Sequence, residues 1–323
     1  MNKRIYFHAN ASKIEGSGHV MRMYALAEEA KSRNIETVLI GRVVDVPWIT
    51  REFLSRVFDS VFENAAEAPL DFKNSALIWD SYHIDQETLQ VISLPFSHKF
   101  LVADAATPIQ SADCVFLLED SPKWDEYLKK ASTRFLKGRH LVPIRKSHQS
   151  GMLFKRCSDK SNLHVLLFAG GVEHQTFVPS LSEIILEKFP EISMTVISSK
   201  SDLTSSSRLQ IQKPTGNIDS LFESADLVIC SASSSILEVL ARRIPSGFIL
   251  TAENQIANRE YLLSECLSIE IGALMDGQFV FDLSSLGLLL QDINTRKRLQ
   301  SMSAEKFEGL GSSLIIDYVE QIS

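Results

Sequence analysis

Short apolar runs and amphipathic segments alternate along the first half of the chain. The runs are continuously apolar and rich in β-branched or aromatic residues, which is typical of strands covered on both faces in a parallel sheet. A helix is predicted over 19–33, between the first two runs. The predicted strands of this half lie within KRIYFHAN, ETVLIG, ALIWD, KFLVAD and CVFLLE.

The same pattern begins again after a polar stretch at 145–162 that carries five Lys or Arg residues. We take this stretch as the connection between an N-terminal domain, 1–150, and a C-terminal domain, 151–323, whose last helix could pack back on the N-terminal one. Two successive α/β halves predict two doubly wound, Rossmann-like domains that face each other across a cleft. The second half has predicted strands in NLHVLLFAGG, EISMTVISS, RLQIQK and DLVICSA, and predicted helices in TFVPSLSEIILEKFP, SSSILEVLARR, NREYLLSE and RKRLQSMSAEKFEGL.

Composition narrows the class of protein. The net charge of −7 argues against nucleic acid binding through a broad basic face. The four cysteines are scattered, no leader is visible, and no apolar run approaches the roughly 18 residues of a membrane span, so we expect a cytoplasmic protein without an integral membrane segment. A phosphate would have to be bound locally, beyond the carboxyl ends of strands. The turns of interest are 8–19, 80–85, 169–175 and 231–235.

The first of these turns leads from a strand into a helix through KIEGSGHVMR. Gly16 and Gly18, with Ser17 between them, allow φ > 0 and the close approach of a ligand. The helix dipole and Arg22, one turn along, both oppose protonation of His19. A neutral, exposed imidazole suits a general base. The alternative is a solvent-exposed histidine at a helix start whose glycines serve only the turn.

A second candidate lies in IWDSYHIDQETL, where Asp80 closes a buried strand. Ser81, Tyr82 and His83 follow at the expected edge of the cleft, where polar and aromatic groups could orient a sugar ring or a nucleophilic water. The alternative, which the residues alone favour, is a helix cap beside a partly packed tyrosine. Asp104 ends the strand in KFLVAD in the same way and has the same alternative.

The loop AGGVEHQTF of the second half could contact a diphosphate, because it joins a strand to a helix. Gly170 and Gly171 could present backbone N–H groups to phosphate oxygens. A plain strand-to-helix turn would have the same sequence, and His174 in this loop is more typical of a surface residue than of a catalyst.

The stretch ADLVICSASSSILEVLARR gives the stronger signal of the second half. Small residues lead from a buried strand into a helix, and hydroxyl and N–H donors for phosphate come from Ser233, Ser234 and Ser235. Glu238 interrupts an apolar helix face and could accept hydrogen bonds from both ribose hydroxyls of a nucleotide. The alternative is that Ser235-x-x-Glu238 is a capping box. Asn254 and Gln255, after the next strand, suit either sugar hydroxyls or a cap.

Taken together, these motifs resemble one enzyme family. HANASKIEGSGHVMRMYALA is similar to the opening of the UDP-2,4-diacetamido-2,4,6-trideoxy-β-L-altropyranose hydrolases of pseudaminic acid biosynthesis, typically Arg-Ala-Asp-Ala-Ser and then Ile-Gly-x-Gly-His-Val-Met-Arg. DSYHID resembles their Asp-x-Tyr-x-x-Asp segment, and 217–272 follows their order of small residues, helical glutamate, proline and Asn-Gln. The similarity spans most of the chain, and GSGHVMR is its most specific part. The C-terminal half alone is also similar to the transferase that makes lipid II and to other GT-B glycosyltransferases.

The resemblance implies a GT-B-like UDP-sugar hydrolase of pseudaminic acid or related nonulosonate biosynthesis, with no metal and no cofactor. The family's catalytic histidine falls on His19, its tyrosine on Tyr82, its uridine-binding glutamate on Glu238, and its amide pair on Asn254 and Gln255. Water activated by the histidine would attack the anomeric carbon with inversion, and UDP would leave. We expect a monomer or weak dimer. Further substrate contacts are expected from Asn10, Gly16, Ser17, Gly18, Arg22, Asp80, Gly170, Gly171, Ser233, Ser234 and Ser235.

Several positions depart from the family pattern. His8 stands where Arg is usual, Asn10 where Asp is usual, Glu15 where an apolar residue is usual, and Ala103-Asp104 where Asp-Asp is usual. The small-residue turn is Ser-Ala-Ser-Ser-Ser rather than Gly-Gly-Ser-Thr. The early changes flank the acceptor side and leave the sugar open, whereas the serine turn affects contacts with the diphosphate and is chemically compatible with them.

Two other functions stay open on the sequence. One is a GT-B glycosyltransferase of surface polysaccharide synthesis, in which a sugar or lipid-linked hydroxyl replaces water and His19 remains the base. A membrane-acting transferase should carry a basic and apolar acceptor surface, at which Val46-Pro47-Trp48-Ile49 only hints. The other is a non-catalytic nucleotide-sugar sensor, against which His19 with its two flanking glycines argues.

Overall fold

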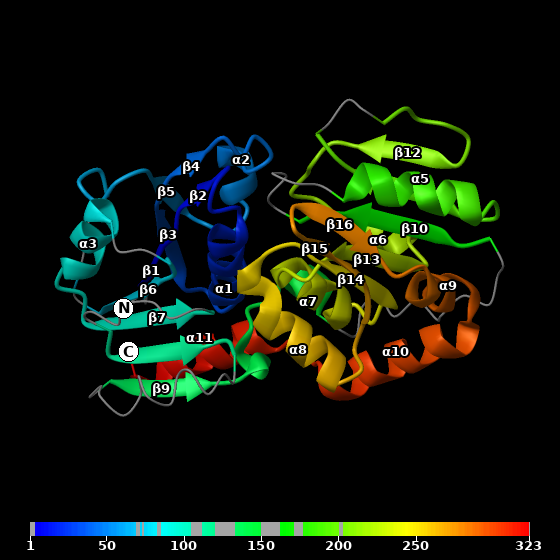
Figure 1. Cartoon of the computed structure of the whole chain (residues 1–323). Helices are drawn as coiled ribbons and strands as arrows, with labels where there is room; N and C mark the ends of the chain where they lie inside the picture. The colour runs from blue at the N-terminus through cyan, green and yellow to red at the C-terminus, as the bar shows by residue number, and fades with distance from the viewer. Residues whose placement is uncertain are drawn as a thin grey trace. The chain divides into compact units, whose positions relative to one another are not determined.

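The computed structural model of the chain divides into two compact units, each with its own sheet (Figure 1). Unit 1 comprises Met1–Lys146 together with Leu310–Ser323, and unit 2 comprises Ser147–Gly309. The residues that the structure describes are 4–68, 72, 74–82, 85–104, 112–119, 133–149, 162–170, 177–199 and 203–322.

Unit 1 is built on a parallel sheet with the strand order β5-β3-β1-β6-β7-β8-β9 (Figure 1). The strands lie where the sequence is continuously apolar, and every residue of β6 and β8 is buried. The order reverses between β1 and β6, which pair with each other. Such a reversal is the switch point at which doubly wound sheets bind ligands. The strands are β1 Arg4–His8, β3 Glu36–Ile40, β5 Ser60–Phe62, β6 Ser75–Trp79, β7 His98–Ala103, β8 Cys114–Leu117 and β9 Arg134–Lys137.

The helices of unit 1 begin at residues that the sequence marks as caps or turns. Helix α1, Gly18–Ser32, follows β1 through a short loop, and its inner face is almost fully buried. Helix α3, Gln86–Ser93, follows β6 and is capped by Asp85, whose carboxylate accepts from Thr88 N at 2.7 Å. Such a cap contributes about 1 kcal/mol. The smaller elements are α2 Arg51–Leu54, η1 Arg139–Leu141, and a two-stranded sheet of β2 Ala11–Ser12 and β4 Val43–Val44.

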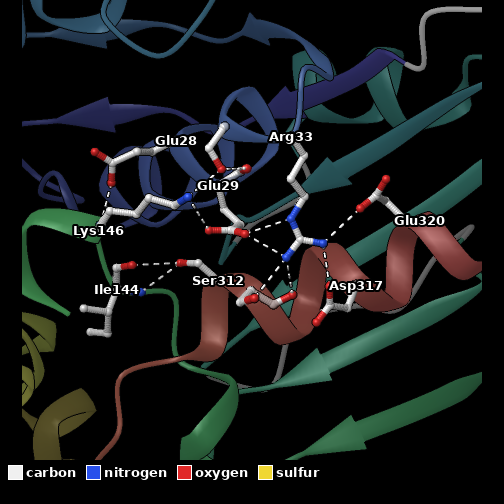
Figure 2. A network of polar contacts seen from close by, with 10 residues as sticks. Glu28, Glu29, Arg33, Ile144, Lys146, Ser312, Asp317 and Glu320 are labelled. Atoms are coloured by element: carbon white, nitrogen blue, oxygen red, sulfur yellow. Dashed lines mark hydrogen bonds and ion pairs between the residues drawn. The ribbon is translucent and has the colours of Figure 1, made fainter. Parts of the chain in front are cut away.

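The C-terminal helix α11, Gly311–Ile322, lies in unit 1 and packs against α1. Figure 2 shows the polar network on this contact, centred on Arg33 just after α1. Its guanidinium contacts Asp317 at 2.5 Å and Glu320 at 2.9 Å on α11, and Glu29 at 2.7 Å on α1. One exposed pair of this kind contributes little, whereas several carboxylates around one guanidinium fix its geometry.

The end of the first stretch of unit 1 is tied to the same two helices (Figure 2). The Ser312 hydroxyl donates to Ile144 O at 2.9 Å and accepts from Ile144 N at 3.1 Å. Lys146 N donates to Glu28 at 2.6 Å, and its ammonium lies 3.0 Å from Glu29. Unit 1 therefore closes on itself around α1 and α11.

Unit 2 has a second sheet, in the order β12-β11-β10-β13-β14-β15-β16, and its reversal lies between the paired strands β10 and β13. All neighbours are parallel except β15 and β16. The strands are β10 His164–Phe168, β11 Ser193–Ile197, β12 Leu209–Gln212, β13 Leu227–Ser231, β14 Ser246–Leu250, β15 Ile269–Met275 and β16 Gln278–Phe281. The helices are η2 Lys146–His148, whose last two residues lie in this unit, α5 Val178–Lys188, α6 Asp219–Ser224, α7 Ser234–Ala241, η3 Glu253–Gln255, α8 Ile256–Ser264, α9 Leu283–Gln291 and α10 Ile293–Lys306.

The strands and helices predicted from apolar patterning are present in both units. The pattern missed the hairpin of β15 and β16, because only one of the seven residues of β15 is buried. Asp276 and Gly277, both at positive φ, form its turn, and Asp-Gly is a hairpin signal in its own right. None of the described helices combines the length and the apolar character that a membrane span requires.

Candidate active site

The switch point of unit 1 brings together side chains from three turns. His19 and Arg22 lie on the first turn of α1, Asp80 follows β6, and Asp104 follows the neighbouring strand β7. Asp80 is held at the end of β6 by a backbone hydrogen bond from its N–H to His8 O at 3.0 Å. The predicted residues His19, Arg22 and Asp80 therefore form one cluster.

The central contact is between His19 and Asp80. Nδ1 of the imidazole lies 2.6 Å from Oδ1 of the carboxylate, and the two residues are 3% and 1% exposed. Oδ1 of Asp80 can only accept, whereas Nη2 of Arg22, which can only donate, lies 2.9 Å from the same Nδ1. We take the shorter contact, with Asp80, to set the tautomer, so that Nδ1 carries the proton. The neutral ring then has its lone pair on Nε2, for which the described residues provide no hydrogen-bond partner. This is the tautomer of a general base held by a carboxylate.

Arg22 balances the charge of this carboxylate. Its Nε donates to Asp80 Oδ2 at 2.6 Å and Nη2 to Oδ1 at 3.1 Å, a bidentate pair, while Nη1 reaches Asp104 at 2.6 Å. Burial by itself would raise the pKa of Asp80, but the charge of Arg22 and the contact with His19 outweigh it and hold that pKa well below its ordinary value. Asp80 is therefore ionised at neutral pH and can stabilise an imidazolium.

Tyr82 completes the cluster. Its ring meets the imidazole of His19 edge to face, with centroids 4.3 Å apart, and its hydroxyl donates to Asp104 Oδ2 at 3.3 Å. Burial, and next the charge of Asp104, raise the pKa of the phenol well above its ordinary value. Tyr82 therefore stays protonated and can act as a hydrogen-bond donor but not as a base. The second oxygen of Asp104, Oδ1, is buried without a partner among the described residues.

Two expectations about these turns are wrong. His19 was expected to be exposed, but it is buried; Arg22 does contact its Nδ1, at 2.9 Å, but the carboxylate of Asp80 is nearer, at 2.6 Å. The alternative interpretation, in which Asp80 is a helix cap, is also wrong, because the residue that caps α3 is Asp85. A buried imidazole needs a partner for its N–H, and the strand end supplies one.

The turn before α1 owes its shape to one of its two glycines. Gly16 has φ of 81° and pairs with Ser12 in a tight turn, its N–H donating to Ser12 O at 2.8 Å. Gly18 does not have positive φ and is already the first residue of the helix. Ser17 is the N-cap and is only 6% exposed, and its side chain makes no capping hydrogen bond.

His8 and Asn10, two of the departures from the family pattern, have structural partners. His8 donates from Nδ1 to Ile40 O at 2.8 Å and accepts at Nε2 from the Thr88 hydroxyl at 3.1 Å. Burial lowers its pKa, so the ring is held neutral. Asn10 was expected to contact substrate, and its Oδ1 accepts from Arg42 N at 2.8 Å on the next loop.

The switch point of unit 2 carries hydroxyl and backbone groups. Gly170 follows β10 with φ of 91°, and a Cβ at this position would lie 3.0 Å from the Oγ of Ser233 and 3.2 Å from that of Ser231. The two hydroxyls are themselves bonded at 2.8 Å. Ser235 Oγ would lie 3.7 Å from the same Cβ. A glycine here keeps the serine oxygens uncovered, as close approach by a ligand requires.

The capping-box alternative for this helix is wrong. Helix α7 begins at Ser234, so its N-cap is Ser233, and no side chain makes a capping bond there. Ser235 and Glu238 both lie inside the helix, where they cannot form the box. The N-terminal N–H groups of α7 thus keep their capacity to bind an anion.

Glu238 is half-buried and has a histidine beside it. Its Oε2 lies 3.5 Å from Nε2 of His148, a residue at the start of unit 2 that is fully buried. Sequence reasoning missed His148, because it stands in the polar stretch at 145–162 that we took as a connection. A histidine flanked by polar residues gives no sign of burial.

The amide residues after β14 separate into different roles. Gln255 is turned back on its own loop, where its Oε1 accepts from Thr251 N at 3.0 Å. Asn254 is exposed. Asn258, which sequence reasoning missed, donates to Ala232 O at 2.8 Å and so supports the serine turn. Three residues of the sequence analysis, Gly171, His174 and His83, lie outside the described part of the chain.

The described residues contain no cluster of three or more His, Cys, Asp or Glu side chains placed to hold a metal ion. A comparison with family models and with curated protein sequences gives no match.

Solved structures with the same architecture cover almost the whole chain. The glycotransferase of kitacinnamycin is 13% identical, with a TM-score of 0.66 over 99% of each chain. The calicheamicin glycosyltransferase is 13% identical, with a TM-score of 0.62 over 100% of this chain and 98% of its own. The UDP-GlcNAc 2-epimerase from Neisseria meningitidis, solved with UDP-GlcNAc bound, is 12% identical, with a TM-score of 0.62 over 99% of this chain and 100% of its own. The prediction of two Rossmann-like domains is confirmed, and the chain has the GT-B fold.

Proposed function

We propose that the protein is a nucleotide-sugar hydrolase that releases UDP from a UDP-linked amino or deoxy sugar, in pseudaminic acid or related nonulosonate biosynthesis. The observation that carries the proposal is the buried contact between His19 and Asp80, at 2.6 Å, which leaves Nε2 of the imidazole as the basic atom. The motif GSGHVMR adds the resemblance to that hydrolase family. Among proteins of the same fold, an epimerase binds UDP-GlcNAc.

In the proposed reaction, Nε2 of His19 removes a proton from water as the water oxygen bonds to the anomeric carbon of the sugar. The bond between that carbon and the diphosphate oxygen breaks, and UDP leaves with the electron pair. Asp80 stabilises the imidazolium through Nδ1–H, as its depressed pKa allows. Attack and departure on opposite faces of the ring give inversion.

Tyr82 and Asp104 are suited to orient the sugar or the water. Because the pKa of Tyr82 is raised, its hydroxyl remains a donor throughout the reaction. Oδ1 of Asp104, with no partner among the described residues, can accept from a hydroxyl or amide of the substrate. Arg22 pairs with both carboxylates, and its Nη2 also lies 2.9 Å from Nδ1 of His19, so it is assigned the role of holding these groups in place, not direct substrate contact.

Unit 2 is proposed to bind the nucleotide part of a UDP-sugar. The N-terminus of α7 and the hydroxyls around Gly170 would hold the diphosphate and stabilise the charge that develops on it. Glu238 would accept from the ribose hydroxyls. Its place inside α7, with no part in a cap, supports this assignment.

A panel of UDP-sugars, incubated with and without alcohol acceptors and followed by NMR, tests the proposal. We expect free sugar and UDP without any acceptor, with the inverted anomer formed first. A requirement for an acceptor would contradict the hydrolase and favour a glycosyltransferase, in which His19 would deprotonate the alcohol instead. Binding of UDP-sugar without turnover in either condition would favour a sensor.

A further inference from the structure

Outside the proposed catalytic cluster, His148 is a buried histidine with several close polar and aromatic neighbours. This residue ends η2 and is 0% exposed. Its ring packs edge to face on Phe222 of α6, with centroids 5.4 Å apart. The guanidinium of Arg242, just after α7, lies 5.2 Å from the ring centroid of the same Phe222. A histidine from the connection at 145–162 is thus packed between α6 and the end of α7, the helix that carries Glu238.

Arg242 decides the tautomer of this histidine. Its Nε lies 2.6 Å from Nδ1 of His148. The carboxylate of Asp219 also faces Nδ1, but at 3.4 Å, so the guanidinium is the nearer partner. A guanidinium has only donors, so Nδ1 accepts and the ring proton of the neutral imidazole lies on Nε2. Arg242 is itself held by Ser147 O, at 2.8 Å from Nη2, and by the carboxylate of Asp219.

The Nε2–H so fixed lies 3.5 Å from Oε2 of Glu238, longer than an ordinary hydrogen bond but within the range of an electrostatic contact. The imidazole and the carboxylate therefore meet donor to acceptor. The Glu238 side chain is 20% exposed, so it is neither fully buried nor free in solvent. A carboxylate placed in this way can be reached by a ligand from its exposed side.

We propose that His148 is a positioning residue: with its tautomer set by Arg242, it orients the carboxylate of Glu238 toward the two ribose hydroxyls of the bound nucleotide. The inference rests on the proposed function, because it takes Glu238 to be the ribose acceptor. A positioning residue should change how well the protein distinguishes ribose from a sugar without hydroxyls, whereas a residue needed only for folding should weaken both ligands alike.

The test compares the affinities of UDP and 2′,3′-dideoxy-UDP by calorimetry in the full-length protein. The wild type should prefer UDP by about tenfold or more, as expected for hydrogen bonds to a carboxylate. His148→Asn places an amide near the Nδ1 position and loses the donor to Glu238, so most of this preference should be lost. His148→Gln places an amide near the Nε2 position and should retain most of it.

The outcomes separate the two proposals. If both His148 variants keep the full preference, or weaken UDP and its dideoxy analogue by the same factor, the positioning role is refuted. If the wild type has no preference, or Glu238→Gln leaves the preference unchanged, then Glu238 is not the ribose acceptor, and the inference is overturned together with that part of the proposed function.

Discussion

The switch points of the two sheets carry different kinds of side chain, ionisable in unit 1 and uncharged hydroxyl in unit 2. In unit 1 four ionisable side chains, His19, Arg22, Asp80 and Asp104, are connected by contacts of 2.6 Å, and all but Asp104 are buried. In unit 2 the groups around Gly170 are serine hydroxyls at a helix start that no side chain caps.

This difference indicates a division of roles. In the buried cluster Arg22 pairs with two carboxylates, and Asp80 holds the imidazole of His19, an arrangement that suits proton transfer. An uncapped helix start surrounded by hydroxyls provides fixed donors without net charge, which suits the binding of an anion. Loss of the first should remove turnover, and loss of the second should remove affinity.

The largest effect is expected from His19→Gln. Without the base, turnover of the UDP-sugar should fall by about 10²–10⁴-fold, while UDP affinity should change by less than about twofold, since no part of the proposed nucleotide site is altered. Steady-state kinetics and calorimetry measure the two quantities. His140→Gln, at an exposed histidine of η1, is the control and should match the wild type. A matching loss of UDP affinity in His19→Gln would contradict the division of roles.

Asp80→Asn should affect both turnover and stability. Removal of one partner of a buried ion pair leaves Arg22 paired only with Asp104, and we expect the free energy of unfolding to fall by about 3 kcal/mol. Turnover of the folded fraction should also fall, because a neutral amide cannot balance an imidazolium. Denaturant unfolding and kinetics below the transition measure these effects. Asp317→Asn, which removes a half-exposed partner of Arg33, should cost less than about 1 kcal/mol. Full turnover in Asp80→Asn would show that the pair is only structural.

Gly170→Ala sharpens the other side of the comparison. The Cβ of the alanine would approach Ser233 Oγ to 3.0 Å and cover the serine hydroxyls. Because the loss of one charged contact costs roughly 1.4 kcal/mol, UDP affinity should fall by about tenfold. Uridine, which has no diphosphate, should keep its affinity. Gly277→Ala is a matched control, because Gly277 also has positive φ, of 79°, but a Cβ there would meet nothing within 4 Å. If both variants weaken UDP equally, backbone strain and not the serine cluster is responsible.

The smallest effect concerns His8, which lies beside the cluster but outside it. Burial lowers its pKa in the folded state, so the unfolded chain binds the proton first as the pH falls. The contribution of neutral His8 to the free energy of unfolding is therefore complete above the pKa of the unfolded state, about 6.5. It is lost as the pH falls through that value toward the pKa of the folded state. His8→Asn should reduce the fall in unfolding free energy between pH 7.5 and 5.5. An unchanged fall in the variant would contradict the neutral assignment.

Much of the fold follows from patterning alone. Strands such as β6 and β13 are buried at every residue, as strands of a parallel sheet covered on both faces are. Their continuously apolar sequences therefore predict them as strands. The hairpin of β15 and β16 did not follow, because its mostly unburied residues carry no apolar run. Its Asp-Gly turn was the available signal.

The sequence predicted which residues belong to the candidate site better than it predicted the contacts between them. Glycine spacing and strand ends singled out His19, Arg22, Asp80 and Tyr82, but spacing cannot show that Asp80 binds Nδ1 across 61 positions of sequence. Arg22 was expected to act on His19, and its Nη2 does lie 2.9 Å from Nδ1, but spacing could not show that the same guanidinium also pairs with two carboxylates. His148 could not be found, since nothing in its local sequence indicates burial.

The most direct test of the central claim is hydrolysis of a UDP-sugar in H₂¹⁸O, with the label located by mass spectrometry. If His19 activates water against the anomeric carbon, one ¹⁸O enters the released sugar and none enters UDP, and the reaction is lost in His19→Gln. Label in the phosphate of the product, or undiminished incorporation in His19→Gln, would contradict the account.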